Sequence, residues 1–174
     1  MKKSSVRWWK NSRKTRKRSE IIKGRNIMAT IKELTKSDFN AIKELFYSVF
    51  TGPPWFDDWS DEEQLDNYLL DIMEVRNALI YGLYKDDRFI GMTIGRLKHW
   101  QGGTEYFVEE LCIRNEYQGK GLGTEFMEKV EDELKKKNVH TMILITERSM
   151  PAFKFYGKRG FSEVKDSVLL FKDF

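Results

Sequence analysis

The chain is poor in the residues that form disulfides and metal sites. Its 174 residues include one cysteine, Cys112, and two histidines, His99 and His140. A single cysteine cannot form an intramolecular disulfide, which favours a reducing cytoplasm. The two histidines have no ligand-like spacing to each other or to Cys112, so no metal site is expected. A Ser-His-Asp triad has no support beyond the presence of those residue types.

Long apolar runs are also missing. No apolar stretch approaches the roughly 18 residues that a membrane-spanning helix needs. The basic N-terminus is not followed by an apolar core, so it does not resemble a secretory signal. Hydrophobic residues make up 40% of the chain and aromatic residues 14%, which is typical of a globular protein of one domain. A single cytoplasmic domain without a membrane span is therefore predicted.

The charge is unevenly distributed. Residues 1–27 contain 11 Lys or Arg and one acid, whereas residues 28–174 carry a net charge of −6. We interpret 1–27 as a basic tail, disordered or a leader ahead of Met28, and 28–174 as the domain. The alternative is a basic arm for nucleic acid or an anionic membrane, with Trp8 and Trp9 as anchors.

Hydrophobic periodicity predicts the element order β-α-α-β-β-β-α-β-α-β-β. Helix starts are expected at the N-cap pairs Thr35 with Asp38 and Ser60 with Glu63. The predicted strands are 31–34, 78–84, 89–97, 106–113, 141–145, 161–164 and 168–171. The predicted helices are 39–50, one opening at Ser60 and carrying apolar residues as far as Ile72, 121–137 and 151–158.

A glycine-rich segment, Gln118–Gly123, connects a strand to a helix. Glycines let the backbone approach a ligand closely, and the first N–H groups and the dipole of the helix favour an anion. A dinucleotide-binding motif would need glycine at position 124, which is threonine, and a P-loop would need serine or threonine at position 121, which is glycine. Both motifs are therefore excluded. A plain glycine-rich turn remains the alternative to a phosphate cradle. The surviving pattern is Gln-x-x-Gly-x-Gly, formed by Gln118, Gly121 and Gly123.

With this segment the chain resembles the GCN5-related N-acetyltransferases (GNAT) over nearly all of residues 30–174. A second stretch, Ala152–Phe161, resembles the family's Ala-x-x-Phe-Tyr-x-x-x-Gly-Phe about 30 residues after the glycines. The resemblance implies an α/β fold, α+β in some schemes. Its sheet would be mixed, mostly antiparallel and twisted, with about seven strands and about four flanking helices. It also implies acetyl-CoA as co-substrate and no metal.

The resemblance also implies which residues hold acetyl-CoA. The backbone of Leu111, Cys112 and Ile113 would bind the pantetheine arm. Phe155 and Ser149 would complete the site, although the family often has Asn where Ser149 stands, so serine would cap the helix or reach the cofactor. The residues implied to hold the pyrophosphate are Gln118, Gly119, Lys120, Gly121, Leu122 and Gly123.

The reaction needs a proton acceptor, because an amine attacks as the free base while a lysine-like amine has a pKa near ~10.4. Backbone N–H groups of residues 109–113 are expected to bind the oxyanion. Tyr156 stands where relatives protonate the sulfur; a core tyrosine is the alternative. Glu109 and Glu110 are the candidate bases, and strand alternation predicts that only one faces the cleft. Resemblance to polyamine acetyltransferases ranks Glu109 first.

The binding site for the acceptor amine is expected in residues 51–59. Its aromatic and acidic side chains suit a cationic, partly apolar amine, and an aromatic-packed loop is the alternative. Similar Pro-Pro-Trp loops occur in aminoglycoside N-acetyltransferases, which favours an aminoglycoside, polyamine or other small cationic amine. A protein N-terminus or lysine, a non-catalytic acyl-CoA sensor and an RNA-binding protein remain alternatives, and a homodimer is left open. The predicted acceptor residues are Trp55, Asp57, Asp58 and Trp59.

Overall fold

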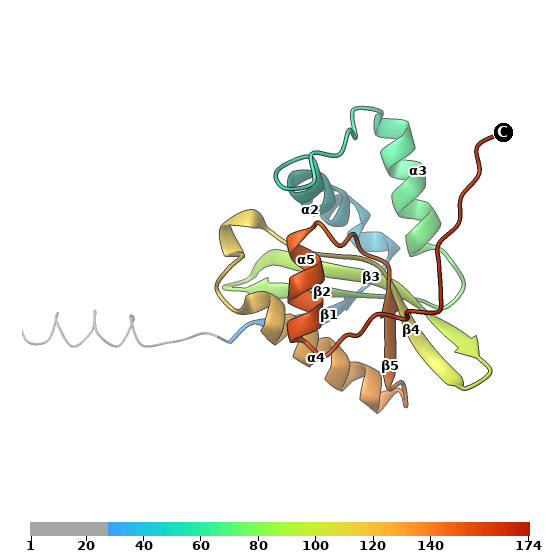
Figure 1. Ribbon diagram of the computed structural model, residues 1–174. Coiled ribbons are helices and arrows are strands. Elements are labelled where there is room, and N and C mark those ends of the chain that lie inside the picture. Colours follow the sequence, from blue (N-terminus) through green and yellow to red (C-terminus); the bar gives the residue numbers. More distant parts are fainter. Residues whose placement is uncertain (1–27) are drawn as a thin grey trace, which may run out of the picture.

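Figure 1 shows the computed structural model, which describes residues 28–174. The basic tail predicted at residues 1–27, including Trp8 and Trp9, lies outside the described residues. Five strands form one sheet in the order β1-β2-β3-β4-β5. Within the described part of the chain, no helix is long and apolar enough to cross a membrane.

Four strands of the sheet are antiparallel neighbours and the fifth is parallel. β2 and β3 form the predicted hairpin, which turns at Asp86 and Asp87 with φ angles of 50° and 60°. Two successive positive φ angles are the geometry of a tight hairpin turn. β5 pairs in parallel with β4. The strand bounds are β1 Thr30–Leu34, β2 Ala78–Lys85, β3 Arg88–Trp100, β4 Gly103–Ile113 and β5 Thr141–Leu144.

The helices begin at side-chain caps or at turns between strands. The predicted capping box is confirmed, because Thr35 N donates to Asp38 Oδ2 at 2.9 Å. The start predicted at Ser60 is wrong by one residue, because Asp61 is the N-cap and accepts from Gln64 N at 3.0 Å. The helices are η1 Lys36–Asp38, α2 Phe39–Phe50, α3 Glu62–Met73, η2 Asn115–Tyr117, α4 Leu122–Lys136 and α5 Pro151–Lys158.

Helices cover both faces of the sheet. α2 and α3 lie against one face, where Ile42, Leu45 and Ile94 are fully buried. α4 covers the other face through Phe126 and Val130, also fully buried (Figure 1). Each such side chain contributes roughly 1.5–3 kcal/mol to the free energy of unfolding.

One buried tyrosine ties the central strands together. Tyr106 on β4 is fully buried, and its hydroxyl donates to the carbonyl oxygen of Leu79 on β2 at 2.9 Å. The ring passes directly over Gly95 of β3, where a Cβ atom would lie 2.6 Å from the Tyr106 ring. Glycine is therefore required at this position so that β3 can pass beneath the ring.

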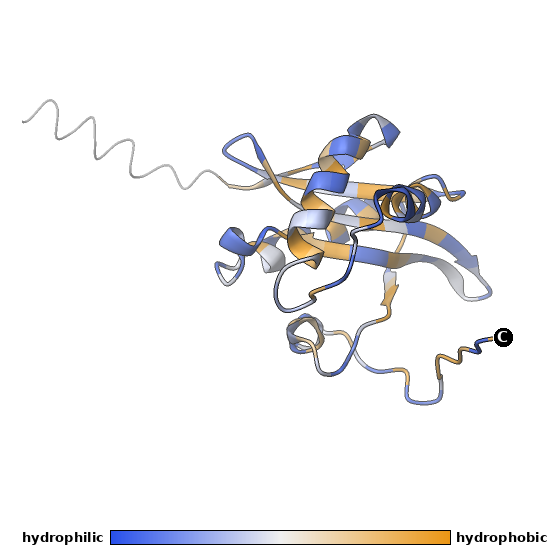
Figure 2. Cartoon of the chain, turned by 90° about the horizontal axis from the view of Figure 1, so that it is seen from above, coloured by the Kyte–Doolittle hydropathy of each residue, from blue (hydrophilic) through white to orange (hydrophobic). Residues whose placement is uncertain are grey.

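The two closing strands predicted at 161–164 and 168–171 are not formed. The chain makes a turn in which Ser167 N donates to the carbonyl oxygen of Val164 at 3.2 Å. It then leaves the sheet, as Figures 1 and 2 show, with Phe171 88% exposed. Apolar residues of strand-forming type become a strand only where a neighbouring edge pairs with them. The sheet therefore has five strands rather than about seven, while the predicted fold class is confirmed.

Replacing the buried aromatic side chain of α4 tests the core. Phe126→Ala is expected to lower the free energy of unfolding by about 3–5 kcal/mol, because Phe126 is fully buried and its removal leaves a cavity. The same change at Phe56, which is 70% exposed, is expected to cost less than about 0.5 kcal/mol. Urea unfolding measures both values, and equal losses would contradict the assigned core.

Candidate active site

The site lies where two parallel strands separate. β4 and β5 pair only from Glu105 with Thr141 to Val108 with Leu144. Past that point residues 110–113 are paired with β3 alone among the described residues, and Glu109 is paired with neither strand. Backbone N–H and C=O groups of this stretch therefore face the space between the strands, where they can bind the amide groups of an extended ligand.

The glycine segment is held in place by the side chain of Gln118. Its Nε2 atom donates to the carbonyl oxygen of Ile113 at 2.8 Å and to Asn115 Oδ1 at 2.9 Å. Gly119 and Gly121 have φ angles of 70° and 80°, the left-handed region that glycine adopts most readily. A Cβ atom at either glycine would meet nothing within 4 Å. The segment thus presents bare backbone to the solvent.

The N-terminus of α4 completes an anion cradle. Within the described residues, the backbone N–H groups of 119–124 donate no hydrogen bond, and the N-cap Gly121 provides no capping side chain. Unpaired N–H groups and the helix dipole make such a site favourable for phosphate. The side chain of Leu122 is buried in the core, so only its backbone could contact a ligand at this segment. Lys120 folds back, and its amine donates to the carbonyl oxygen of Glu116 at 2.6 Å.

The second signature packs beside the first. A Cβ atom at Gly123 would lie 3.5 Å from the ring of Phe155 and 4.0 Å from Ile113. α5 is therefore in contact with the start of α4 and the end of β4. Ser149 does not cap α5, because Met150 is the N-cap and makes no side-chain cap. The Ser149 hydroxyl instead donates to Glu147 Oε2 at 3.4 Å.

Tyr156 is buried between two phenylalanines. Its ring centroid lies 5.4 Å from those of both Phe155 and Phe161. Burial, together with the nearby Glu110 and Cys112, raises the pKa of Tyr156 to about 12. Tyr156 is therefore a protonated hydrogen-bond donor throughout the neutral pH range.

The two glutamates of β4 lie at a β-bulge. Ile94 of β3 is paired with Glu110, while Gly95, the next residue, is paired with Val108. Glu109 is therefore an extra residue without a partner on β3. A bulge of this kind interrupts the alternation of side chains along a strand.

Because of the bulge, both carboxylates lie on the sheet face that α2 and α3 cover. Glu109 Oε1 is 3.4 Å from Nη1 of Arg96. Arg96 follows Ile94 by two residues and so shares the face on which Ile94 is buried. The hydroxyl of Tyr68, on α3, donates to Glu110 Oε1. The prediction that only one of the two glutamates faces the cleft assumed an unbroken strand, and this bulge removes that assumption.

Glu110 is a buried acid that titrates near neutrality. The pKa of Glu110 is raised to about 7: burial is the main cause, the charges of Asp57 and Glu109 add to it, and the hydrogen bond from Tyr68 opposes it. Both the protonated and the ionised forms of Glu110 are therefore accessible near neutral pH. Burial and the Glu110 charge also raise the pKa of Tyr68, which keeps its hydroxyl a donor.

Cys112 lies two residues after Glu110 on β4 and is buried. Burial raises the pKa of the Cys112 thiol, and a buried protonated thiol is a poor nucleophile. Within residues 28–174, no group of three or more His, Cys, Asp or Glu is arranged to hold a metal ion.

The loop predicted to bind the acceptor amine, residues 51–59, joins α2 to α3. It contacts Tyr68, which is hydrogen-bonded to Glu110. The Trp59 ring stacks on Tyr68, with centroids 5.1 Å apart and an interplanar angle of 30°. Trp55 packs on Phe50 at 5.6 Å, so both indoles are part of an aromatic cluster. Asp58 is engaged locally, since its Oδ1 accepts from Ser60 N at 3.1 Å.

Asp57 is the last of the residues predicted to bind the acceptor amine, and it is exposed. Its charge contributes to the raised pKa of both Glu110 and Tyr68. The loop therefore places one exposed carboxylate close to the buried one.

Two residues at this site, Tyr68 and Arg96, were not found from the sequence. Tyr68 occupies a core-facing position of a helix, and its partner Glu110 is 42 residues away. No local pattern connects them. The one available signal was a hydroxyl-bearing ring among aliphatic residues, since a buried tyrosine hydroxyl usually has a polar partner.

Solved structures share this fold across nearly their whole length. A predicted acetyltransferase from Clostridium acetobutylicum, solved with acetyl-CoA, has a TM-score of 0.64 at 13% identity and covers 82% of this chain and 96% of its own. An aminoglycoside acetyltransferase from an uncultured soil metagenomic sample has a TM-score of 0.64 at 14% identity, and the match covers 86% of this chain and 98% of that one. A ribosomal-protein-alanine N-acetyltransferase from Brucella melitensis has a TM-score of 0.65 at 16% identity, and the match covers 84% of this chain and 100% of that one. Such low identities establish the fold alone.

A family model gives the more specific result. Residues 39–161 match the model described as the acetyltransferase (GNAT) family. No curated protein matches the chain. The matched range contains β4 and β5, the glycine segment and the helices α2 to α5, and it begins directly after the short helix η1. The chain therefore belongs to the acetyltransferase (GNAT) family and is an acetyl-CoA-dependent N-acetyltransferase.

Proposed function

We propose that the enzyme acetylates a primary amine of a small cationic molecule by direct attack in a ternary complex. The observation that carries this proposal is the buried Glu110 carboxyl group, which titrates near neutrality and is hydrogen-bonded by Tyr68 beside the point where β4 and β5 separate. A base with a pKa near the working pH gives effective general-base catalysis.

The donor side of the site follows from the backbone. Acetyl-CoA supplies an acyl group activated as a thioester. The unpaired N–H groups of 119–124 would hold its pyrophosphate, and the free edge of Leu111, Cys112 and Ile113 would align its pantetheine arm. An N–H group of the same edge would bind the carbonyl oxygen as negative charge develops on it.

Glu110 is assigned as the base in preference to Glu109, because Glu109 is already paired with Arg96. A lysine-like ammonium has a pKa near ~10.4, so transferring its proton to a carboxylate of pKa about 7 is uphill by roughly 5 kcal/mol. Glu110 therefore does not account for catalysis alone. Holding both substrates in one cleft contributes comparably, since positioning is worth roughly 7–11 kcal/mol at best.

Tyr156 is assigned to the leaving group. Its pKa of about 12 is above the ~8.5 of a simple thiol. Full transfer of its proton to the thiolate is therefore uphill. Tyr156 stabilises the sulfur by donating a hydrogen bond, and the proton that finally resides on the thiol originates from the amine.

The acceptor is assigned from charge and aromatic surface. Asp57 and Glu109 lie near Glu110, and Trp59 stacks beside it on Tyr68. This combination suits a cationic amine such as an aminoglycoside or a polyamine, and an aminoglycoside acetyltransferase is among the structural neighbours. A protein N-terminus is the second candidate, because a ribosomal-protein-alanine N-acetyltransferase is an equally similar neighbour.

Substituting each glutamate separately tests the base. Glu110→Gln is expected to lower kcat/KM for the amine by roughly 10²–10⁴-fold without weakening acetyl-CoA binding. The matched variant Glu109→Gln is expected to lose less than about tenfold. Thiol release with a panel of cationic amines measures both. A larger loss in Glu109→Gln would transfer the role of base to Glu109, and no turnover of any cationic amine by the wild type would reject this acceptor class.

The pH profile tests the contact between Tyr68 and Glu110. The acid limb of kcat/KM is expected near pH 7, where Glu110 ionises. Tyr68→Phe removes a hydrogen bond that favours the ionised carboxylate, so this limb is expected to move to higher pH. Tyr47→Phe, a change at a half-exposed tyrosine of α2, provides the control. An unmoved or lowered limb in Tyr68→Phe would contradict the assigned role.

A single added methyl group tests the phosphate cradle. Gly121→Ala forces alanine into a left-handed conformation, which costs roughly 1–2 kcal/mol, and places a methyl group on the ligand side of the segment. Affinity for acetyl-CoA is expected to fall at least about tenfold. Gly102→Ala, where the added Cβ also meets nothing within 4 Å, is expected to bind normally. Calorimetric titration measures both, and normal binding by Gly121→Ala would remove the cradle from this segment.

A further inference from the structure

Arg96 is held in place beside the two glutamates of β4. It is paired across the strands with Phe107, so the two side chains share one face of the sheet. Its guanidinium carbon lies over the Phe107 ring, 5.3 Å from the centroid, and its Nη1 atom lies 3.4 Å from Glu109 Oε1. A guanidinium can bind an aromatic face and a carboxylate at the same time. Two contacts therefore restrain a side chain that is 39% exposed.

Glu109 couples this cation to Glu110. It is the extra residue of the bulge, and Glu110 follows it directly in the sequence. The charge of Glu109 raises the pKa of Glu110, so the two carboxylates interact. Within the described residues, Glu109 forms an ion pair with Arg96 and Glu110 forms none. Arg96 is therefore placed to offset the charge that Glu109 exerts on Glu110.

The other groups that face Glu110 supply no positive charge. Tyr68 on α3 donates a hydrogen bond to its Oε1 atom, and the charge of Asp57, in the loop of residues 51–59, raises its pKa. The charge of Glu110 in turn raises the pKa of Tyr156 on α5 and of Cys112 on β4. The buried residues of α2, which covers the same face, are all apolar. Glu110 is thus surrounded by neutral and acidic groups.

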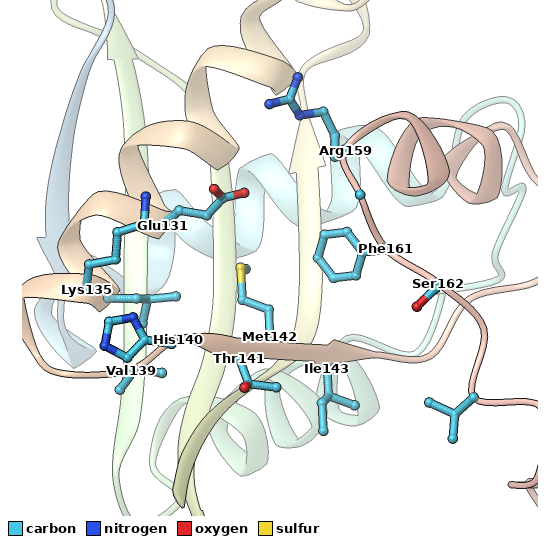
Figure 3. Close-up of a pocket in the computed structure, with 13 residues that line it drawn as sticks. Glu131, Lys135, Val139, His140, Thr141, Met142, Ile143, Arg159, Phe161 and Ser162 are labelled. Atoms are coloured by element: carbon cyan, nitrogen blue, oxygen red, sulfur yellow. The ribbon is translucent and has the colours of Figure 1, made fainter.

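Other cations are engaged elsewhere. Arg114, at the end of β4, has its Nη2 atom 2.8 Å from Glu44 Oε1. Lys135 belongs to α4 on the opposite face of the sheet. It lines a groove of about 470 Å³ between β5, the end of α4 and the chain that follows α5, where Figure 3 shows it beside Glu131. The raised pKa of Glu110 has no cause in Arg114 or Lys135.

We propose that Arg96 is a positioning residue for the reaction, which keeps Glu110 able to ionise by neutralising Glu109 across the bulge. This role rests on the proposed function, in which Glu110 is the base. Within the described residues no ion pair joins Arg96 to Glu110, so Arg96 acts through Glu109. Without Arg96, the uncompensated charge of Glu109 would make the buried Glu110 hold its proton to higher pH.

Removing either partner of the ion pair is expected to move the titration of Glu110 in opposite directions. Arg96→Gln leaves the negative charge of Glu109 beside Glu110, so the titration moves to higher pH. Glu109→Gln leaves the positive charge of Arg96, so the titration moves to lower pH. The double variant removes a pair without net charge, and we expect its titration within about 0.3 pH unit of the wild type.

Carboxyl NMR measures this titration in the free protein, without turnover. In protein labelled with ¹³C at the glutamate carboxyl groups, the Glu110 signal is identified by its loss in Glu110→Gln. We expect it to titrate at least about 0.5 pH unit higher in Arg96→Gln than in the wild type. Arg96→Lys keeps the charge and is expected to recover most of the difference. Lys135→Gln, which removes a cation from the opposite face, is expected to leave the titration unchanged.

The acid limb of kcat/KM for the amine is expected to follow the NMR titration through the same variants. An unmoved or lowered titration in Arg96→Gln would overturn the role of Arg96 while leaving Glu110 as the base. A double variant displaced as far as Arg96→Gln would also overturn it, because Arg96 would then not act through Glu109. A limb that stays in place while the titration moves would instead reject Glu110 as the base, and with it any role of Arg96 in the reaction.

Discussion

Backbone pairing between β4 and β5 is confined to the stretch from Glu105 with Thr141 to Val108 with Leu144, and the chemistry of the site depends on that limit. Because the strands separate there, residues 109–113 have one free edge inside a folded sheet. The helix that follows has its own free N–H groups at Gly121. A strand edge and a helix end, both with unused donors, together can bind an extended ligand that carries an anion.

The acid–base chemistry depends on a local irregularity beside that edge. The bulge at Glu109 sets two carboxylates on one face, where an unbroken strand would have separated them. One is neutralised by Arg96 and the other is hydrogen-bonded by Tyr68. Two neighbouring acids thus have different environments, which is a physical basis for assigning them different roles.

Much of this arrangement could be predicted from the sequence, because it rests on local rules. The residue pattern predicted α4 and α5, and the glycine-rich segment predicted a backbone that a ligand can approach closely before α4. The bulge could not be predicted, since it depends on the register with β3. Nor could the contact of Tyr68 with Glu110, which joins residues 42 positions apart. The C-terminal segment has the composition of a strand, and whether it becomes one depends on an edge outside the local sequence.

Ionisation of Glu110 has opposite effects on the proposed catalysis, which needs the carboxylate, and on the stability of the fold, which the carboxylate lowers. Its folded pKa of about 7 is above the ordinary glutamate value of 4.5, so the fold favours the protonated acid. This stabilising contribution is complete below the unfolded pKa and is lost as the pH rises through about 7. The difference corresponds to roughly 3 kcal/mol at high pH. Ionised Glu110, the form that would act as the proposed base, is therefore the form that destabilises the fold. Packing alone does not account for a carboxyl group in such a position, and this supports the proposed role of Glu110 in proton transfer.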